Sequence, residues 1–196
     1  MSWIFRVCLG MSVALSAGLS GAKADVAATA DHIAFDTPTL APMAYSQFCL
    51  QYPGECATKR IFRGGPVRLS AERRAELNRV NESVNASIMP EPNQLGLAGE
   101  VWRISPSSGE CHDYAVTKRH ELMAQGWPAR ALLLSEVVVP GGKHHLVLVV
   151  RTNAGDLLLD SLTGRIKPWF KVPYQWVRMQ MPGAPRLWTT IATRAV

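Results

Sequence analysis

The sequence contains no apolar run long enough to cross a bilayer, since a spanning helix needs about 20 apolar residues. The nearest candidate, residues 7–19, is shorter than that. Tandem repeats, low-complexity blocks and a Gly/Ser linker are missing too, which argues against a repeat protein and against two domains. We therefore expect one domain at residues 45–196, preceded by an extended lead-in at residues 25–44.

A strong excess of one charge is also missing. Lys and Arg outnumber Asp and Glu by 21 to 15, which gives a formal net charge of +6. The basic residues form scattered pairs, such as Lys59-Arg60, Arg73-Arg74 and Lys118-Arg119. Because no basic tract interleaved with aromatic residues accompanies them, we expect a solvated surface and no nucleic-acid partner.

The N-terminus has the pattern of an export signal. The uncharged apolar run at 7–19 follows Arg6 and precedes Ala22-Lys23-Ala24, with small residues at the two positions that a signal peptidase reads. We expect a signal peptide at 1–24, with cleavage after Ala28-Thr29-Ala30 or an uncleaved anchor as the alternatives. The exported chain is then expected in the periplasm and not spanning the membrane.

Cysteine is scarce: the chain has four, and Cys8 lies inside the expected signal peptide. Cys49 and Cys56 flank Tyr52-Pro53-Gly54, a turn-forming segment that could bring them within disulfide distance. Two reduced cysteines or two zinc ligands are the alternatives, although no His or Cys cluster completes a zinc site. If the two residues pair, Cys111 is left as an unpaired thiol, either a buried core cysteine or a reactive one.

The spacing of apolar residues predicts an α+β fold. Ser70 is placed to cap a helix in which apolar residues recur every three or four positions, at Leu77, Val80, Val84 and Ile88. A second helix is expected over about 112–125, before Gly126. Apolar, β-branched runs between turn residues predict strands at 132–139, 145–152, 157–160, 175–180 and 186–193. Helices followed by antiparallel strands are typical of the α+β class.

Cys111 stands at the start of the second expected helix, where unpaired amides and the helix dipole lower the pKa of a thiol. His145 begins one expected strand and Asp160 ends the next. A hairpin turning through residues 152–155 or 153–154 would place the two on one face as diagonal neighbours, whereas an odd-length loop without a bulge would separate them. This arrangement suits a hydrolase in which Cys111 attacks a carbonyl carbon, His145 transfers the proton and Asp160 orients the imidazole.

Other residues compete for these roles. His144 points to the opposite face of its strand, so we prefer His145, and the helical His112 and His120 are expected to face solvent. Trp102 is the candidate for a second oxyanion donor, beside the Cys111 amide, or for the lip of the cleft; an ordinary core Trp is the alternative.

Several motifs together suggest a family. Residues 108–115 read Ser108-Gly109-Glu110-Cys111-His112-Asp113-Tyr114-Ala115, followed by Gly126-Trp127-Pro128. Further matches are His145-Leu146-Val147-Leu148 and Leu158-Leu159-Asp160-Ser161-Leu162. These motifs resemble the bacterial transglutaminase-like cysteine proteinases, which include the LapG-type periplasmic proteases, and Phe48-Cys49 with Pro53 and Cys56 resembles their alphaproteobacterial branch.

The resemblance implies a papain-like, transglutaminase-like fold in which N-terminal helices, with the catalytic cysteine at a helix N-terminus, pack on an antiparallel sheet. It implies a Cys-His-Asp triad at Cys111, His145 and Asp160, and proteolysis in the periplasm. It also implies a protein substrate, of which a surface adhesin is the best-known kind, and an inner-membrane regulatory partner. Acyl transfer to an amine, or protein binding without turnover, would use the same cleft.

The resemblance raises calcium as well, because the family commonly reads Gly-Asp-Cys-Glu-Asp-Tyr around the cysteine. Here His112 replaces one acidic ligand and Glu110 lengthens another, whereas Ca²⁺ prefers several oxygen ligands. Glu110 and Asp113 are the residues that would bind the ion, although both could simply interact with the helix dipole. We therefore expect no cofactor to be required.

Overall fold

The computed structural model describes residues 31–57, 65–92, 96 and 99–192. The expected signal peptide at 1–24 lies outside these residues. Within the described part of the chain, no helix is both long enough and apolar enough to cross a membrane.

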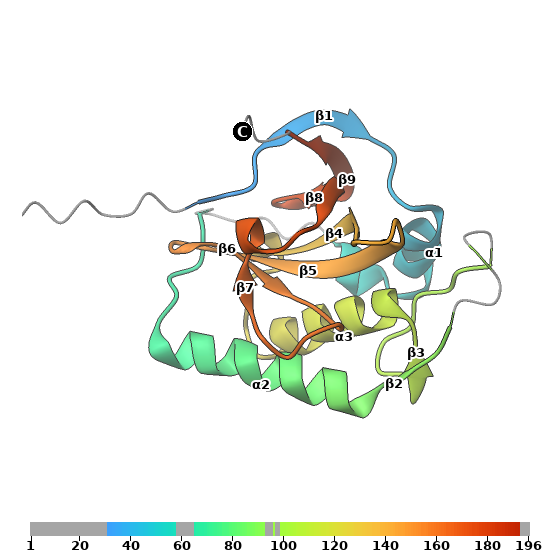
Figure 1. The fold of residues 1–196 in the computed structure, drawn as a ribbon, viewed down its shortest axis with the longest axis horizontal. Helices are drawn as coiled ribbons and strands as arrows, with labels where there is room; N and C mark the ends of the chain where they lie inside the picture. The colour runs from blue at the N-terminus through green and yellow to red at the C-terminus, as the bar shows by residue number, and fades with distance from the viewer. Residues whose placement is uncertain (1–30, 58–64, 93–95, 97–98, 193–196) are drawn as a thin grey trace, which may run out of the picture.

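A seven-stranded antiparallel sheet forms the centre of the fold, in the order β1-β9-β8-β4-β5-β6-β7. Its strands are β1 (Phe35–Thr39), β4 (Leu132–Val138), β5 (His144–Thr152), β6 (Gly155–Leu159), β7 (Lys167–Pro168), β8 (Gln175–Met181) and β9 (Ala184–Ile191). The short strands β2 (Met89–Pro90) and β3 (Ser108–Gly109) form a separate parallel pair near the end of α2 (Figure 1). The helices are α1 (Met43–Gln51), α2 (Ala71–Ser87) and α3 (Cys111–Ala124), with short 3-10 turns at Pro53–Cys56, Ala129–Ala131 and Trp169–Lys171.

Helix α3 is the central helix of the molecule. It lies between α2 and the sheet, where it packs on β5, while β1, β8 and β9 lie on the far side of β4 (Figure 1). Strand β5 supplies core on both faces, since Leu146 and Leu148 pack in the cluster with the helices and Val147 and Val149 in a second cluster. The expected α+β class, with helices packed on an antiparallel sheet, is confirmed.

Helix α2 begins where its sequence predicts. The Ser70 hydroxyl accepts a hydrogen bond from the Arg73 amide at 3.2 Å, which is the expected N-cap. The apolar stripe at Leu77, Val80, Val84 and Ile88 is buried against the core. Helix α2 therefore packs against α3 on the side of α3 that faces away from the sheet.

The N-terminal part of the domain has more regular structure than its sequence predicts. Within the expected lead-in, residues 35–39 are extended, but they form a paired strand, β1, on the edge of β9. Helix α1 follows at Met43 without a side-chain cap, because Pro42 occupies the N-cap position. The disulfide between Cys49 and Cys56, with Cα atoms 5.5 Å apart, joins α1 to the following 3-10 turn and confirms the expected pairing.

Candidate active site

Cys111 is the first residue of α3. Glu110 takes the N-cap position, and the Asp113 carboxylate accepts a hydrogen bond from the Glu110 amide at 3.0 Å, which closes a capping box around the helix start. Cys111 is unpaired and half-buried, and the Leu146 amide donates to its Sγ atom at 3.4 Å. The thiol therefore lies at the end of β5 that carries the two histidines.

His145 and Asp160 are brought together by a two-residue hairpin. Thr152 pairs with Gly155 and Leu148 with Leu159, so the turn runs through residues 153–154, one of the two even-length loops considered. Gly155 has a φ of +102°, which only glycine adopts without strain. The result is that Nε2 of His145 lies 2.7 Å from Oδ1 of Asp160, with both side chains buried.

Asp160 is held by more than the histidine. Its Oδ1 atom also accepts a hydrogen bond from the Leu162 amide at 3.0 Å, and its Oδ2 atom accepts one from the Tyr174 hydroxyl at 2.7 Å. Burial would raise the pKa of this carboxyl group, but the bonds to His145, Leu162 and Tyr174 outweigh burial and lower it. Asp160 is therefore a fixed carboxylate that orients the ring of His145.

The thiol is correspondingly acidic. Burial on its own would raise the pKa of Cys111, but hydrogen bonds to His112 and His145 outweigh it and lower the pKa to about 6. Burial also works against the charged form of His145, yet the bonds to Asp160 and Cys111 raise its pKa to about 9. Because Asp160 occupies Nε2, Nδ1 is the His145 nitrogen left for the thiol. The stable form at neutral pH is then a thiolate beside an imidazolium.

The expectation that His112 faces solvent is wrong. Its side chain is buried at 2 % exposure, and its ring stacks on Trp102 with centroids 5.9 Å apart. Nδ1 of His112 lies 2.8 Å from Oε1 of Glu100 without good hydrogen-bond alignment, so the contact is chiefly an ion pair. Although burial lowers the pKa of His112, the contacts with Cys111 and Glu100 raise it to about 10. Cys111 therefore has two imidazole partners, each of which pairs with a carboxylate.

The other competing residues take structural places. The indole N–H of Trp102 donates to Oε1 of Glu100 at 2.9 Å, and the ring is buried in the core, which is the position that the core alternative gives it. His144 is exposed, and its Nδ1 atom lies 2.6 Å from Oε1 of Glu136. His120 is on the outer side of α3 and contacts Glu55 at 2.7 Å.

The acidic residues beside Cys111 do not suit a calcium ion. Both oxygens of Asp113 are already engaged, by the Arg103 amide at 2.7 Å, the Arg103 guanidinium at 3.3 Å and the Glu110 amide. The His112 ring comes within 3.6 Å of the same carboxylate. A hard divalent cation would have to replace a guanidinium and sit against an imidazolium. Among the described residues, no group of three or more His, Cys, Asp and Glu side chains is arranged to hold a metal ion.

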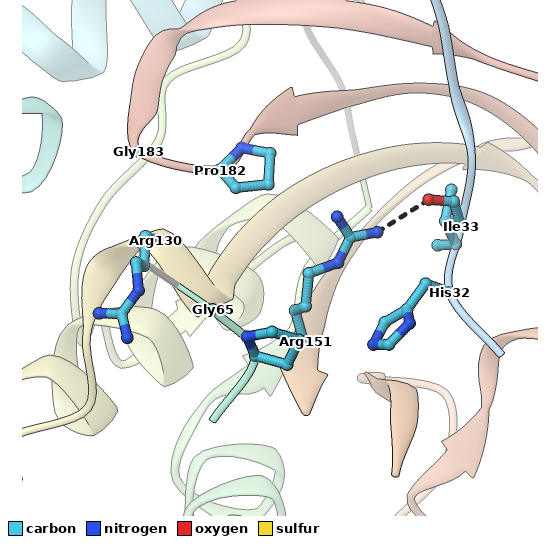
Figure 2. A pocket seen from close by; sticks show the side chains of 8 residues that line it. His32, Ile33, Gly65, Arg130, Arg151, Pro182 and Gly183 are labelled. Atoms are coloured by element: carbon cyan, nitrogen blue, oxygen red, sulfur yellow. Dashed lines mark hydrogen bonds between the residues drawn. The ribbon is translucent and has the colours of Figure 1, made fainter. Parts of the chain in front are cut away.

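A pocket of about 490 Å³ lies away from Cys111, near the opposite end of β5. Its lining includes His32, Arg130 and Arg151 (Figure 2). Arg151 is already paired with Asp156 at 3.0 Å and donates to the Ile33 carbonyl at 2.8 Å, so its charge is compensated inside the protein. The pocket contributes no group to the Cys111 site.

Comparison with known proteins gives a family match over most of the chain. The model described as bacterial transglutaminase-like cysteine proteinase BTLCP matches residues 35–196. Among solved structures, a LapG of Legionella pneumophila is similar with a TM-score of 0.47 and 26 % identity, over 54 % of this chain and 62 % of that chain. A calcium-bound LapG of the same organism matches with a TM-score of 0.53 and 24 % identity, over 63 % of this chain and 73 % of that chain.

The chain thus spans less than two thirds of the length of the first of these structures. The similarity to the calcium-bound LapG shows a similar fold and nothing further. No curated protein sequence matches the chain significantly.

Proposed function

The chain belongs to the bacterial transglutaminase-like cysteine proteinases, and on this basis we propose that it hydrolyses a peptide bond of a protein substrate through Cys111, His145 and Asp160. The observation that carries the proposal is the hydrogen-bonded series from the Cys111 thiol through His145 to the buried Asp160 carboxylate. Such a series activates a nucleophile, orients its base and retains the imidazolium charge in the low-dielectric interior.

The reaction begins with the Cys111 thiolate attacking the carbonyl carbon of the scissile bond. The charge then develops on the carbonyl oxygen, where the Cys111 amide at the start of α3 is one donor. His145 gives its proton to the leaving amine as the C–N bond breaks, and a thioester remains. A water molecule then loses a proton to His145 and adds to the thioester, which releases the acid and restores the thiolate.

His112 is a second imidazole that favours the same thiolate. Its ring is immobilised by the stack on Trp102 and kept cationic by Glu100. We assign it the role of a second cation beside the sulfur, while His145 remains the proton-transfer group because its ring has the free nitrogen directed at the thiol. The three residues Glu100, Trp102 and His112 thus act as one unit next to Cys111.

Calcium has no step in this proposal. One of the similar solved structures is calcium-bound, but in this chain Arg103 and the capping box occupy the Asp113 oxygens. Residues 1–24 have the pattern of an export signal, and an oxidising compartment suits the Cys49–Cys56 disulfide. We therefore place the reaction in the periplasm, on a protein substrate such as a surface adhesin.

The test uses the exported chain from residue 25 onward, with Cys111→Ser as the control because it retains the disulfide. Peptides from a digested proteome are incubated with each protein in H₂¹⁸O, and the products are identified by mass spectrometry. New C-termini that carry ¹⁸O, formed by the wild type and not by Cys111→Ser, support hydrolysis. Amine adducts without ¹⁸O indicate acyl transfer, and a wild-type thiol that iodoacetamide does not modify until unfolding refutes the enzymatic proposal.

A further inference from the structure

Lys118 is a lysine that the reaction described above does not use. It lies in α3 seven residues after Cys111, which is close to two full turns and therefore on the same side of the helix. The residue is completely buried, at 0 % exposure, and its Nζ atom has no hydrogen-bond partner among the residues that the structure describes. A buried ammonium in this state is costly, so its position calls for partners that satisfy it.

Two hydrogen bonds show which part of α2 faces Lys118. The Tyr114 hydroxyl donates to the Ile88 carbonyl at 2.6 Å, and the Trp127 indole donates to Glu76 at 2.9 Å. The helices α2 and α3 therefore run antiparallel, side by side (Figure 1). Lys118 is one turn past Tyr114, so it lies level with the turn of α2 that precedes Ile88, which carries Asn81 and Asn85.

Asn81 and Asn85 have unsatisfied groups that complement Lys118. Their Oδ1 atoms are buried without a hydrogen-bond partner in the described structure, so α2 has two unused acceptors and α3 has one unused donor with three hydrogens. None of the three atoms reaches another directly. Buried polar groups in this arrangement are commonly joined by an internal water, which needs two to four polar partners.

The amide nitrogens of the same asparagines hold the segment that carries Asp160. Nδ2 of Asn85 donates to the Asp160 carbonyl at 2.9 Å, and Nδ2 of Asn81 donates to the Gly164 carbonyl at 3.0 Å. Asp160 also acts on Lys118 through its charge: burial lowers the pKa of Lys118 to about 7, and the carboxylate opposes that shift. The lysine, the two asparagines and the Asp160 segment therefore meet in one buried region.

We propose that Lys118 is a positioning residue which, through internal water and the side chains of Asn81 and Asn85, holds the 160–164 segment so that the Asp160 carboxylate meets His145. The proposal deepens the proposed function and rests on it for its catalytic meaning. The positioning itself can be tested without turnover, because it predicts how well ordered the 160–164 segment is.

The experiment compares the wild type with Lys118→Met, an apolar residue of similar length. Lys171→Met is the matched control, since Lys171 is exposed on the 3-10 turn before β8. Amide hydrogen exchange at Leu162, whose N–H bonds to Asp160, reports the order of the segment. We expect Lys118→Met to raise exchange there by about tenfold and to slow iodoacetamide alkylation of Cys111 by a similar factor, while Lys171→Met changes neither.

The melting temperature of Lys118→Met distinguishes a positioning role of Lys118 from a general contribution to folding. Replacing a buried charge by an apolar residue of similar size is often neutral or stabilising, so the melting temperature of Lys118→Met should not fall in proportion to the loss of order. Asn85→Leu gives a second variant. If both residues belong to one network, the double variant Lys118→Met/Asn85→Leu exchanges at Leu162 about as fast as either single variant rather than as their product.

Unchanged exchange at Leu162 in Lys118→Met overturns the proposal, whatever the activity and whatever Asn85→Leu shows. Should Lys118→Met fail to fold, Asn85→Leu and a crystal structure of the wild type decide: no water or other acceptor within hydrogen-bond distance of Nζ also overturns it. Faster exchange in Lys118→Met together with an inert wild-type Cys111 leaves the network standing and refutes the proposed peptidase instead.

Discussion

Nε2 of His145 lies 2.7 Å from Oδ1 of Asp160, and this contact raises the pKa of the imidazole beside the Cys111 thiol. The thiol loses its proton with a pKa of about 6, and His145 keeps its proton up to a pKa of about 9. Between these values the thiolate and the imidazolium coexist. The carboxylate widens this range at its upper end because it raises the pKa of the histidine.

Asp160→Asn is expected to narrow that range from both sides. Without the negative charge, the pKa of His145 falls, and the weaker imidazolium lets the pKa of Cys111 rise above about 6. Alkylation of Cys111 by iodoacetamide, followed from pH 5 to 9, should show a higher midpoint and a rate at pH 7 lower by about tenfold or more. Asp36→Asn, on exposed β1, is the control. Equal profiles for the two variants would refute the assigned role of Asp160.

The part of the site that local sequence patterns predict is the part made by regular structure. The expected signal peptide, which ends in Ala22-Lys23-Ala24, lies outside the described residues and stays a prediction. By contrast, the strand pattern and the turn residues at 153–155 predict one strand face for His145 and Asp160 if the hairpin loop is even in length, and the observed register has such a loop. Cys111 at a helix start follows from similarly local signals. Their joint role in catalysis remains a prediction until it is tested.

Residues that long-range contacts bring to the site had no such signal. Helical periodicity does not tell what covers the first turn of a helix, and His112 is covered by Glu100 and Trp102, from a connection without regular structure. The Tyr174 hydroxyl donates to Asp160 from the segment before β8. Nothing in the local sequence distinguishes this tyrosine from an ordinary surface residue. Strand β1 likewise depends on pairing with β9, more than 140 positions away.

His112→Gln should make the thiol less acidic. The imidazole of His112 lowers the pKa of Cys111, so its removal raises that pKa from about 6 and reduces the alkylation rate at pH 6 to 7 by about tenfold. His144→Gln is a matched control, because His144 is an exposed histidine that pairs with Glu136. If His112→Gln and His144→Gln alkylate alike, His112 is only a core residue.

Calcium is expected to leave the wild-type protein unaffected. Because a guanidinium and two amides engage the Asp113 oxygens, thermal melts in excess Ca²⁺ and in EGTA should coincide. The double variant Glu110→Asp/His112→Glu restores the acidic pattern that is usual in the family. If it binds the ion, saturation at about 100 times Kd raises its stability by about 2.7 kcal/mol and its melting temperature by several degrees. A calcium-dependent shift in the wild type would contradict this account of the site.

Glu55 and Arg119 join the disulfide segment to α3. Oε2 of Glu55 lies 2.6 Å from Nη1 of Arg119, whose side chain is buried in α3. Glu55→Gln leaves that guanidinium buried without its counter-ion, which costs about 3 to 5 kcal/mol and should appear as a lower urea midpoint. Glu55→Met/Arg119→Met removes both charges, so it should recover most of the loss despite carrying two substitutions. If the double variant is as unstable as Glu55→Gln, the loss comes from packing around Cys56 and not from the uncompensated charge.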